Sequence, residues 1–201
     1  MKFLLTLTVA LSAVSCFVPP KKAVEPNVVD LWTGDDAQLD NWQMAGPGEF
    51  VHDGNTVYAQ GGMGLYWYNE RDFKDFELEL EWQVQDVSNN SGVFVRFPNP
   101  GNDPWVAVNE GYEIQICDTP APKHNTGSIY SFQAATHIPT KSAGEWNHYR
   151  IQVVGQQYTI FINGELVNSY TGERSERGYI GMQNHDDGSP VRYRNIRVTE
   201  I

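Results

Sequence analysis

Short stretches that alternate apolar and polar residues recur along this chain, and they limit its fold more than any other feature. Residues 76–82 read FELELEW, which places every apolar side chain of the stretch on one side of a strand. After Asn27 no segment sustains the period of a helix, and residues 35–39 suffice for one turn at most. The pattern therefore predicts an all-β protein.

Turn residues separate these stretches along the chain. Asp53-Gly54 and Asn163-Gly164 are hairpin signals, because both dipeptides tolerate positive φ. Strands are predicted near residues 49–52, 56–60, 76–85, 91–97, 111–117, 128–131, 146–154, 157–163, 165–170, 178–184 and 191–199. So many antiparallel strands in one domain predict a sandwich of two antiparallel sheets, such as a jelly roll.

The first residues have the pattern of an export signal, with Lys2 followed by an apolar stretch too short to span a bilayer. Small residues at 13–15 form an acceptable cleavage site, so residues 1–15 are predicted to be a signal peptide. Cys16 follows directly and is a candidate for lipid modification. Ala13 stands where a bacterial lipoprotein signal usually has leucine, so plain secretion is the alternative to a lipid anchor. Either way we expect an exported bacterial protein that is periplasmic, lipid-anchored or secreted.

Residues 16–28 contain Pro19, Pro20 and Pro26 and are predicted to be an extended tether to a single domain at 29–201. The formal net charge of −11 repels nucleic acid and anionic lipid, so contact with a membrane is expected only through the lipid anchor. Such a surface is compatible with a neutral carbohydrate partner.

Polar residues occupy one face of two predicted strands in the middle of the chain. In GYEIQIC, Glu113 and Gln115 point to the same side, opposite the three apolar residues. In NSGVFVRF, the alternation places Arg96 with Phe94 and away from the valines. A carboxylate, an amide and a guanidinium beside aromatics are typical of a sugar-binding sheet face, whereas the alternative is a solvated outer face.

A third strand adds to this set. In GYIGMQNH, Gly181, Gln183 and His185 share one face, and the glycine leaves room for a ligand to approach the backbone. His185 could instead be a loop histidine without a role, and the following Asp-Asp-Gly is predicted to form a turn.

Loop residues provide further candidates for substrate contacts. Tyr130 could stack on a sugar ring or donate a proton, and His124 lies in the loop that leads to it. Trp67 and Trp105 are predicted to be loop aromatics suited to sugar stacking. Packing under a long loop is the alternative for both tryptophans.

Several motifs in order make the chain resemble a known family. They are LWTGDDAQLDNW, DFELELEW, NSGVFVRF, GYEIQICD, TGSIY, GEWNHYRI, INGELV and GYIGMQNHDDGSPVRYRNIRV. Together they resemble the 3-keto-disaccharide hydrolase domain family, from about Val29 to the end of the chain. The resemblance implies a concanavalin A-like jelly roll with a ligand-binding concave face. It also implies a hydrolase or lyase that acts on 3-keto-glycosides, with an oxidised glycoside as the partner.

The chain departs from the family in ways that concern the substrate. Cys117-Asp118-Thr119 stands where the family often has Leu-Asp-Asn. The segments 98–109 and 132–142 match no pattern of the family, and we expect them to form the mouth of the cleft. Substrate choice is what these departures put in doubt.

The residues of the strand that carries Glu113 disfavour direct hydrolysis by two carboxylates. A retaining glycosidase needs two carboxylates about 5 Å apart. Related glucanases of this fold carry their acids on one strand, in a pattern resembling E-I-D-I-x-E. In this chain the central acid is replaced by the amide Gln115, and Asp118 has the wrong parity to share a face with Glu113.

A 3-keto sugar allows elimination instead, because the ketone acidifies the hydrogen at C2. His185 is the first candidate for base or acid, since imidazole titrates near neutrality, and Glu113 is the second. Arg96 could hold the developing enolate, while Gln115 and Gln183 suit hydroxyl recognition.

Two alternatives remain open at this point. A divalent metal ion bound by His185 and Glu113 could replace Arg96 as the electrophile, although no close ligand cluster requires one, so the metal is unknown. A non-catalytic carbohydrate-binding module on the same fold is the alternative function, because glutamine, arginine, glutamate and tryptophan serve binding as well as catalysis.

Overall fold

Two antiparallel sheets stack against each other in the part of the chain that the computed structural model describes, which is Met1, residues 26–119 and residues 121–201. The prediction of an all-β sandwich is confirmed. Apart from Met1, the predicted signal peptide lies outside the described residues, and so do Cys16 and the tether up to residue 25.

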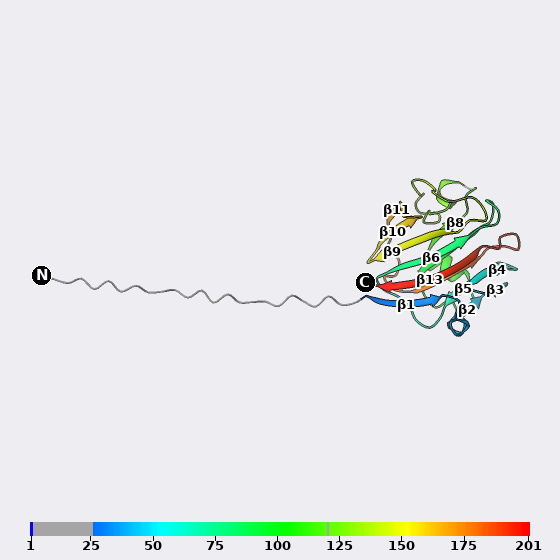
Figure 1. Ribbon diagram of the computed structural model, residues 1–201, viewed down its shortest axis with the longest axis horizontal. Coiled ribbons are helices and arrows are strands. Elements are labelled where there is room, and N and C mark those ends of the chain that lie inside the picture. Colours follow the sequence, from blue (N-terminus) through cyan, green and yellow to red (C-terminus); the bar gives the residue numbers. More distant parts are fainter. Residues whose placement is uncertain (2–25, 120) are drawn as a thin grey trace.

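The larger sheet has eight strands in the order β11-β10-β9-β6-β13-β4-β3, with β1 also paired to β13. Its strands are β1 (Asn27–Trp32), β3 (Glu49–Asp53), β4 (Thr56–Gln60), β6 (Phe76–Gln83), β9 (Asn147–Val154), β10 (Gln157–Ile162), β11 (Glu165–Thr171) and β13 (Arg192–Glu200). Figure 1 shows β9, β6 and β13 side by side across the front of the domain. Because β1 begins at Asn27, the domain starts two residues before the predicted boundary at Val29.

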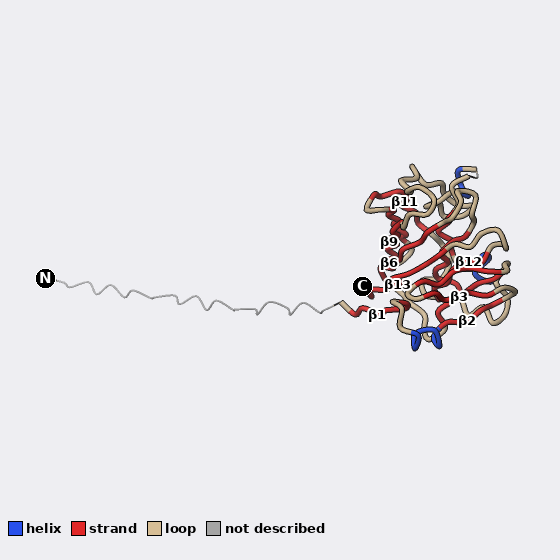
Figure 2. Tube along the Cα trace, turned by 45° about the vertical axis from the view of Figure 1, so that its right-hand side comes forward, coloured by secondary structure: helices blue, strands red, loops and turns tan. Residues whose placement is uncertain are grey.

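The smaller sheet has five strands in the order β2-β5-β12-β7-β8. They are β2 (Trp42–Ala45), β5 (Gly64–Tyr68), β7 (Ser91–Phe97), β8 (Tyr112–Ile116) and β12 (Tyr179–Asn184). The helices are short, as Figure 2 shows: α1 (Trp105–Glu110) and the 3-10 turns η1 (Asp36–Asn41) and η2 (Pro122–His124).

The predicted strands match this arrangement where the sequence alternates apolar and polar residues. In β6 the burial also alternates residue by residue, as FELELEW requires. By contrast β5 reads GLYWY, with no charged or amide side chain, so it shows no alternation and was not predicted. β1 and β2 were not predicted either. The predicted strand at 128–131 is wrong, because only Ile129 makes isolated bridges there and Ser131 has a φ of 65°.

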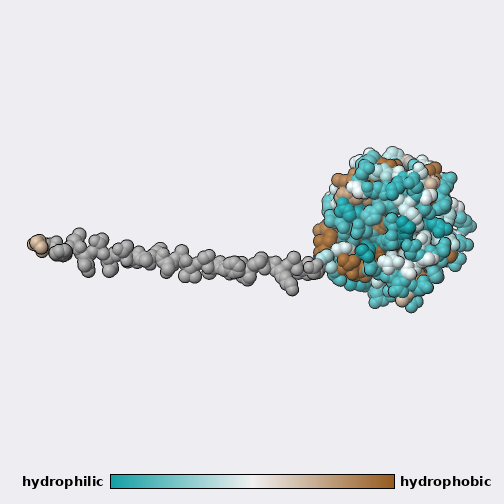
Figure 3. Space-filling model, viewed as in Figure 1, coloured by the Kyte–Doolittle hydropathy of each residue, from teal (hydrophilic) through white to brown (hydrophobic). Residues whose placement is uncertain are grey.

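The main core lies between the sheets and is rich in aromatic rings. Trp82 on β6 stacks on Tyr149 of β9, with the ring centroids 4.0 Å apart. Val93 and Val95 on β7 and Ile114 on β8 close the core from the smaller sheet. The outer face of the larger sheet carries charged pairs such as Glu77 with Arg150, and the face of the domain seen in Figure 3 is mostly hydrophilic.

A second, smaller cluster lies on the other face of the smaller sheet, beneath α1. It contains Leu65, Trp67, Phe94, Phe97 and Ala107, and Ala107 is the helix residue that packs onto the sheet. The prediction that Trp67 is a loop aromatic is therefore wrong, since Trp67 lies on β5 and is 2% exposed. Because α1 covers only part of this face, the rest of the face is free to carry a site.

A bulge in β7 changes the predicted position of Arg96. Its φ is 62°, and the pairing with β12 passes from Val95 directly to Phe97. The bulge places Phe97 with Phe94 on the outer face and turns Arg96 away from it. The prediction that Arg96 shares the polar face with Phe94 is therefore wrong.

Arg96 instead holds together connections at one end of the sandwich. Its side chain is fully buried, and Nη1 donates to the carbonyl oxygens of Gly155 and Ser175 at 3.0 and 3.3 Å. Nη2 donates to the carbonyl of Lys74 and, at 3.3 Å, to Oδ1 of Asp75. These acceptors come from three separate loops, so this single guanidinium joins them.

We expect Arg96→Ala to lower the free energy of unfolding by about 3–5 kcal/mol, because it empties the space of a fully buried side chain and removes the donor to carbonyls of three loops. Arg197→Ala is the control, because Arg197 pairs with Asp30 at 2.6 Å on the surface, where such pairs contribute at most about 1 kcal/mol. Chemical denaturation of the two variants measures both values. Equal losses would contradict the account of Arg96.

Candidate active site

A cleft of about 120 Å³ opens on the outer face of the smaller sheet, beside α1. Strands β7, β8 and β12 form its floor, and loops before β5, before β7 and after β8 form its rim. Its walls are formed by Met63, Gly64, Asn90, Phe94, Pro104, Trp105, Val108, Glu113, Gln115, Tyr130, Gln183 and His185. Glu113 and Gln115 of GYEIQIC thus meet Gln183 and His185 of GYIGMQNH in one cavity.

Glu113 lies in the floor and is almost completely buried, with 6% of its surface exposed. Gly92 on the neighbouring strand makes its position possible, because a Cβ there would lie 2.2 Å from Oε1 of Glu113. Oε1 has no hydrogen-bond partner among the described residues. Burial raises the pKa of Glu113 to about 8, so this carboxyl group is protonated at neutral pH.

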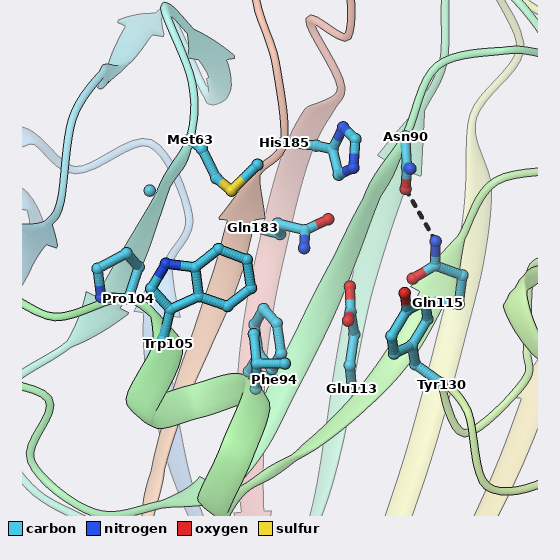
Figure 4. A pocket seen from close by; sticks show the side chains of 12 residues that line it. Met63, Asn90, Phe94, Pro104, Trp105, Glu113, Gln115, Tyr130, Gln183 and His185 are labelled. Atoms are coloured by element: carbon cyan, nitrogen blue, oxygen red, sulfur yellow. Dashed lines mark hydrogen bonds between the residues drawn. The ribbon is translucent and has the colours of Figure 1, made fainter.

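Two amides lie beside this acid. Gln115 donates from Nε2 to Oδ1 of Asn90 at 2.8 Å, as Figure 4 shows. Its own Oε1 and the Oε1 of Gln183 are buried without a partner in the described part of the chain. Buried polar atoms normally have partners, so these oxygens indicate that a ligand supplies the donors. Hydroxyl groups have the required chemistry.

His185 stands at the rim and is oriented by the next residue. Its Nδ1 lies 2.5 Å from Oδ2 of Asp186. Burial opposes ionisation of Asp186, but the hydrogen bonds from His185, Gly188 and Ser189 hold the pKa of Asp186 below its ordinary value. Because an ionised carboxylate can only accept, Nδ1 of His185 carries a proton, so the tautomer that this contact selects has its lone pair on Nε2.

The other wall of the cleft is apolar. Trp105 and Met63 face the polar side chains in Figure 4, and Pro104 and Val108 flank Trp105 on the same segment. Phe94 lies between the two halves in the floor. The cleft therefore offers hydrogen-bonding groups to one part of a ligand and apolar surface to another.

Tyr130 closes the cleft next to Gln115, and His124 supports it from behind. The two rings stack with their centroids 4.6 Å apart, and Nε2 of His124 lies 3.3 Å from Oγ of Ser131. His124 does not line the cleft, so we place it as a support for Tyr130 and not as a substrate contact.

The structure thus brings together six of the predicted site residues, which are Glu113, Gln115, Tyr130, Gln183, His185 and Trp105. Arg96 and Trp67 do not reach the cleft. Sequence reasoning missed Asn90 and Met63, which lie in loops without a pattern. It also read Asp186 only as a turn residue; the turn is present, since Oδ1 accepts from the N–H of Gly188, but the same carboxylate also orients His185.

The side chain of Asp118 lies outside the cleft, as its parity in the strand predicted. Its two oxygens accept hydrogen bonds from Thr126 and Thr140, and it does not line the cleft. Within residues 26–119 and 121–201, no three His, Cys, Asp or Glu side chains are grouped so as to hold a metal ion. None of the helices described is long and apolar enough to cross a membrane.

Comparison with known proteins agrees with this geometry. Residues 28–199 match the 3-keto-alpha-glucoside-1,2-lyase-like domain family. The chain belongs to this family. A curated relative from Bacteroides thetaiotaomicron, named 3-keto-disaccharide hydrolase, is 31% identical over 70% of this chain. The match spans 63% of that relative's length.

Solved structures of low sequence identity share the fold of this family member. A putative glycosyl hydrolase from Parabacteroides distasonis has a TM-score of 0.73 at 23% identity, covering 87% of this chain and 100% of the other. A carbohydrate binding module from Bacillus subtilis has a TM-score of 0.58 at 14% identity, covering 78% and 94%. These likenesses establish the lectin-like sandwich.

The raised pKa of Glu113 makes the stability of this family member depend on pH. Between pH 4.5, the ordinary pKa of glutamate, and about pH 8, the folded chain keeps the proton of Glu113, whereas the unfolded chain has lost it. The stabilisation from this group is thus fully present below 4.5 and decreases by at most about 1.4 kcal/mol per pH unit up to 8.

We expect Glu113→Gln to remove this decrease, because the amide stays neutral at every pH. The variant should be more stable than the parent at pH 8, and the difference should shrink toward pH 4.5. Thermal unfolding at several pH values measures it, with Glu110→Gln on the surface as the control. A difference that does not change with pH would contradict the buried, protonated state of Glu113.

Proposed function

We propose that this chain is an exported enzyme that cleaves 3-keto-glycosides by proton abstraction at C2, elimination of the aglycone and hydration. The observation that carries the proposal is the protonated Glu113 in the same cleft as His185, whose Nε2 lone pair is available. The family membership and the curated relative support a sugar hydrolase or lyase of this kind. Export rests on the pattern of residues 1–16 alone.

In this reaction His185 acts as the base and Glu113 as the acid. Nε2 of His185 takes the C2 proton, and the electrons of that bond form an enolate with the C3 ketone. The carboxylic acid of Glu113 donates a hydrogen bond to the C3 oxygen, which stabilises the charge that develops there. Asp186 fixes the His185 ring and stabilises the imidazolium that forms.

The remaining steps release the aglycone and add water to the sugar. The enolate re-forms the ketone and a C1–C2 double bond, the C1–O bond breaks, and the proton held by His185 leaves with the aglycone alcohol. Water then adds across the double bond, with hydroxyl to C1 and hydrogen to C2, so the net reaction is hydrolysis. If water does not add, the enzyme is a lyase. Gln115 and Gln183 accept hydrogen bonds from hydroxyl groups of the sugar.

We expect aglycone release from a 3-keto-glucoside and none from the unoxidised glucoside, because only the ketone acidifies C2. His185→Ala should lower the rate by about 10²- to 10⁴-fold. His148→Ala is the control, since His148 lies on β9 beside Glu79 and outside the cleft. Binding of glucosides without release of aglycone from either would favour a carbohydrate-binding module and would overturn the enzyme.

Deuterium oxide tests the elimination itself. Product released in this solvent should carry deuterium at C2, because the hydrogen added there comes from water. Mass spectrometry and NMR of the product measure the incorporation, and product incubated without enzyme corrects for exchange next to the ketone. Hydrolysis without deuterium at C2 beyond that control would indicate direct displacement at C1.

A further inference from the structure

The apolar half of the cleft is unusual because it is exposed. Trp105 has 53% of its surface exposed and Met63 has 41%, and both line the cleft opposite the polar residues. Of the large exposed apolar side chains in the described part of the chain, only these two belong to the cleft. An exposed apolar surface next to a ligand site is available to be covered by part of that ligand.

Trp105 is presented on a fixed piece of backbone. Its N–H donates to Oδ1 of Asp103 at 3.0 Å, at the start of α1. Pro104 packs so close to Gly46 that a Cβ on Gly46 would lie 2.7 Å from Pro104 Cγ.

The other end of α1 is held by Arg174. Its Nη1 donates to the carbonyl oxygens of Val108, at 3.1 Å, and of Gly111. A helix fixed at both ends holds the backbone of Trp105 at one place beside the cleft, so no backbone ordering is needed when a ligand binds there.

The two halves of the cleft differ in the ligand groups with which they can interact. Asn90, Glu113, Gln115 and Tyr130 lie on the side of the cleft away from Trp105, and Gln183 and His185 lie between them and the apolar pair. A second sugar would stack its C–H face on Trp105 but leave the hydroxyls that point away from Gln183 and His185 without protein partners, whereas an aromatic ring would bury the indole and the thioether.

We propose that the group on the leaving side of the substrate is an apolar, preferably aromatic, aglycone that packs against Trp105 and Met63. This inference rests on the proposed function for the direction of the substrate, with the oxidised sugar at the polar half. It adds a preference for aryl and arylalkyl glycosides over disaccharides.

Benzyl and methyl glucosides test the preference, because benzyl alcohol and methanol are leaving groups of similar acidity. Calorimetry measures the binding of unoxidised benzyl glucoside, methyl glucoside and cellobiose. Kinetics with the 3-keto forms of the same three compounds gives kcat/KM for each. We expect the benzyl compound to be favoured over the methyl compound by about 10-fold or more in either measurement, as burial of one aromatic ring predicts. Cellobiose should show no such advantage.

Trp105→Ala should reduce the benzyl advantage over the methyl compound to about 3-fold or less, because the aromatic ring of the aglycone loses its packing surface. Leu166→Ala is the control, because Leu166 is 51% exposed on β11 and outside the cleft. Equal behaviour of benzyl and methyl compounds in both measurements, or a Trp105→Ala effect larger for cellobiose, would overturn the proposal. A benzyl preference in binding without aglycone release would instead refute the proposed reaction and leave the aromatic subsite standing.

Discussion

Glu113 is buried in the floor of the cleft, where its Oε1 finds no hydrogen-bond partner in the described part of the chain. Ionising it there would place a charge in a poorly solvated site, so the group keeps its proton. The neighbouring strands are built around this acid, since Gly92 leaves the space that its side chain occupies. The resulting donor at neutral pH is what distinguishes the cleft from an ordinary polar sheet face.

The fold supplies this position by dividing one face of the smaller sheet in two. Ala107 of α1 packs with Phe94 and Phe97 over one part, and the cleft occupies the other. His185 follows directly on β12 and receives its orientation from the turn that carries Asp186. The sandwich thus places His185 at the rim and the protonated Glu113 in the floor of one cleft, which is the arrangement that the proposed reaction requires.

Strand parity explains how much of this could be predicted from the sequence. Alternation alone put Glu113 with Gln115, and Gln183 with His185, and the structure joins both pairs in one cleft. It failed for Arg96, because a single bulge residue at positive φ reverses the faces that follow it. Trp67 was misplaced for another reason: β5 reads GLYWY, and a strand without charged or amide side chains has no alternating signal.

The role of Asp186 depends on side-chain contacts that no spacing reveals, because the same residue also closes a turn. The burial of Glu113 likewise depends on the small size of Gly92, which lies on the neighbouring strand β7 and not beside it in sequence. Residue types and parity therefore predicted the polar centre of the site, while its loop residues and its protonation states required the three-dimensional structure.

The protonation of Glu113 can be measured directly. Protein labelled with ¹³C at the glutamate side-chain carboxyl gives one NMR signal per glutamate, and Glu113→Gln identifies the signal of Glu113 by its loss. The account predicts that this signal titrates with a midpoint of about 8. A midpoint near the ordinary value of 4.5 would contradict it, because the floor of the cleft would then carry a carboxylate at neutral pH and no acid.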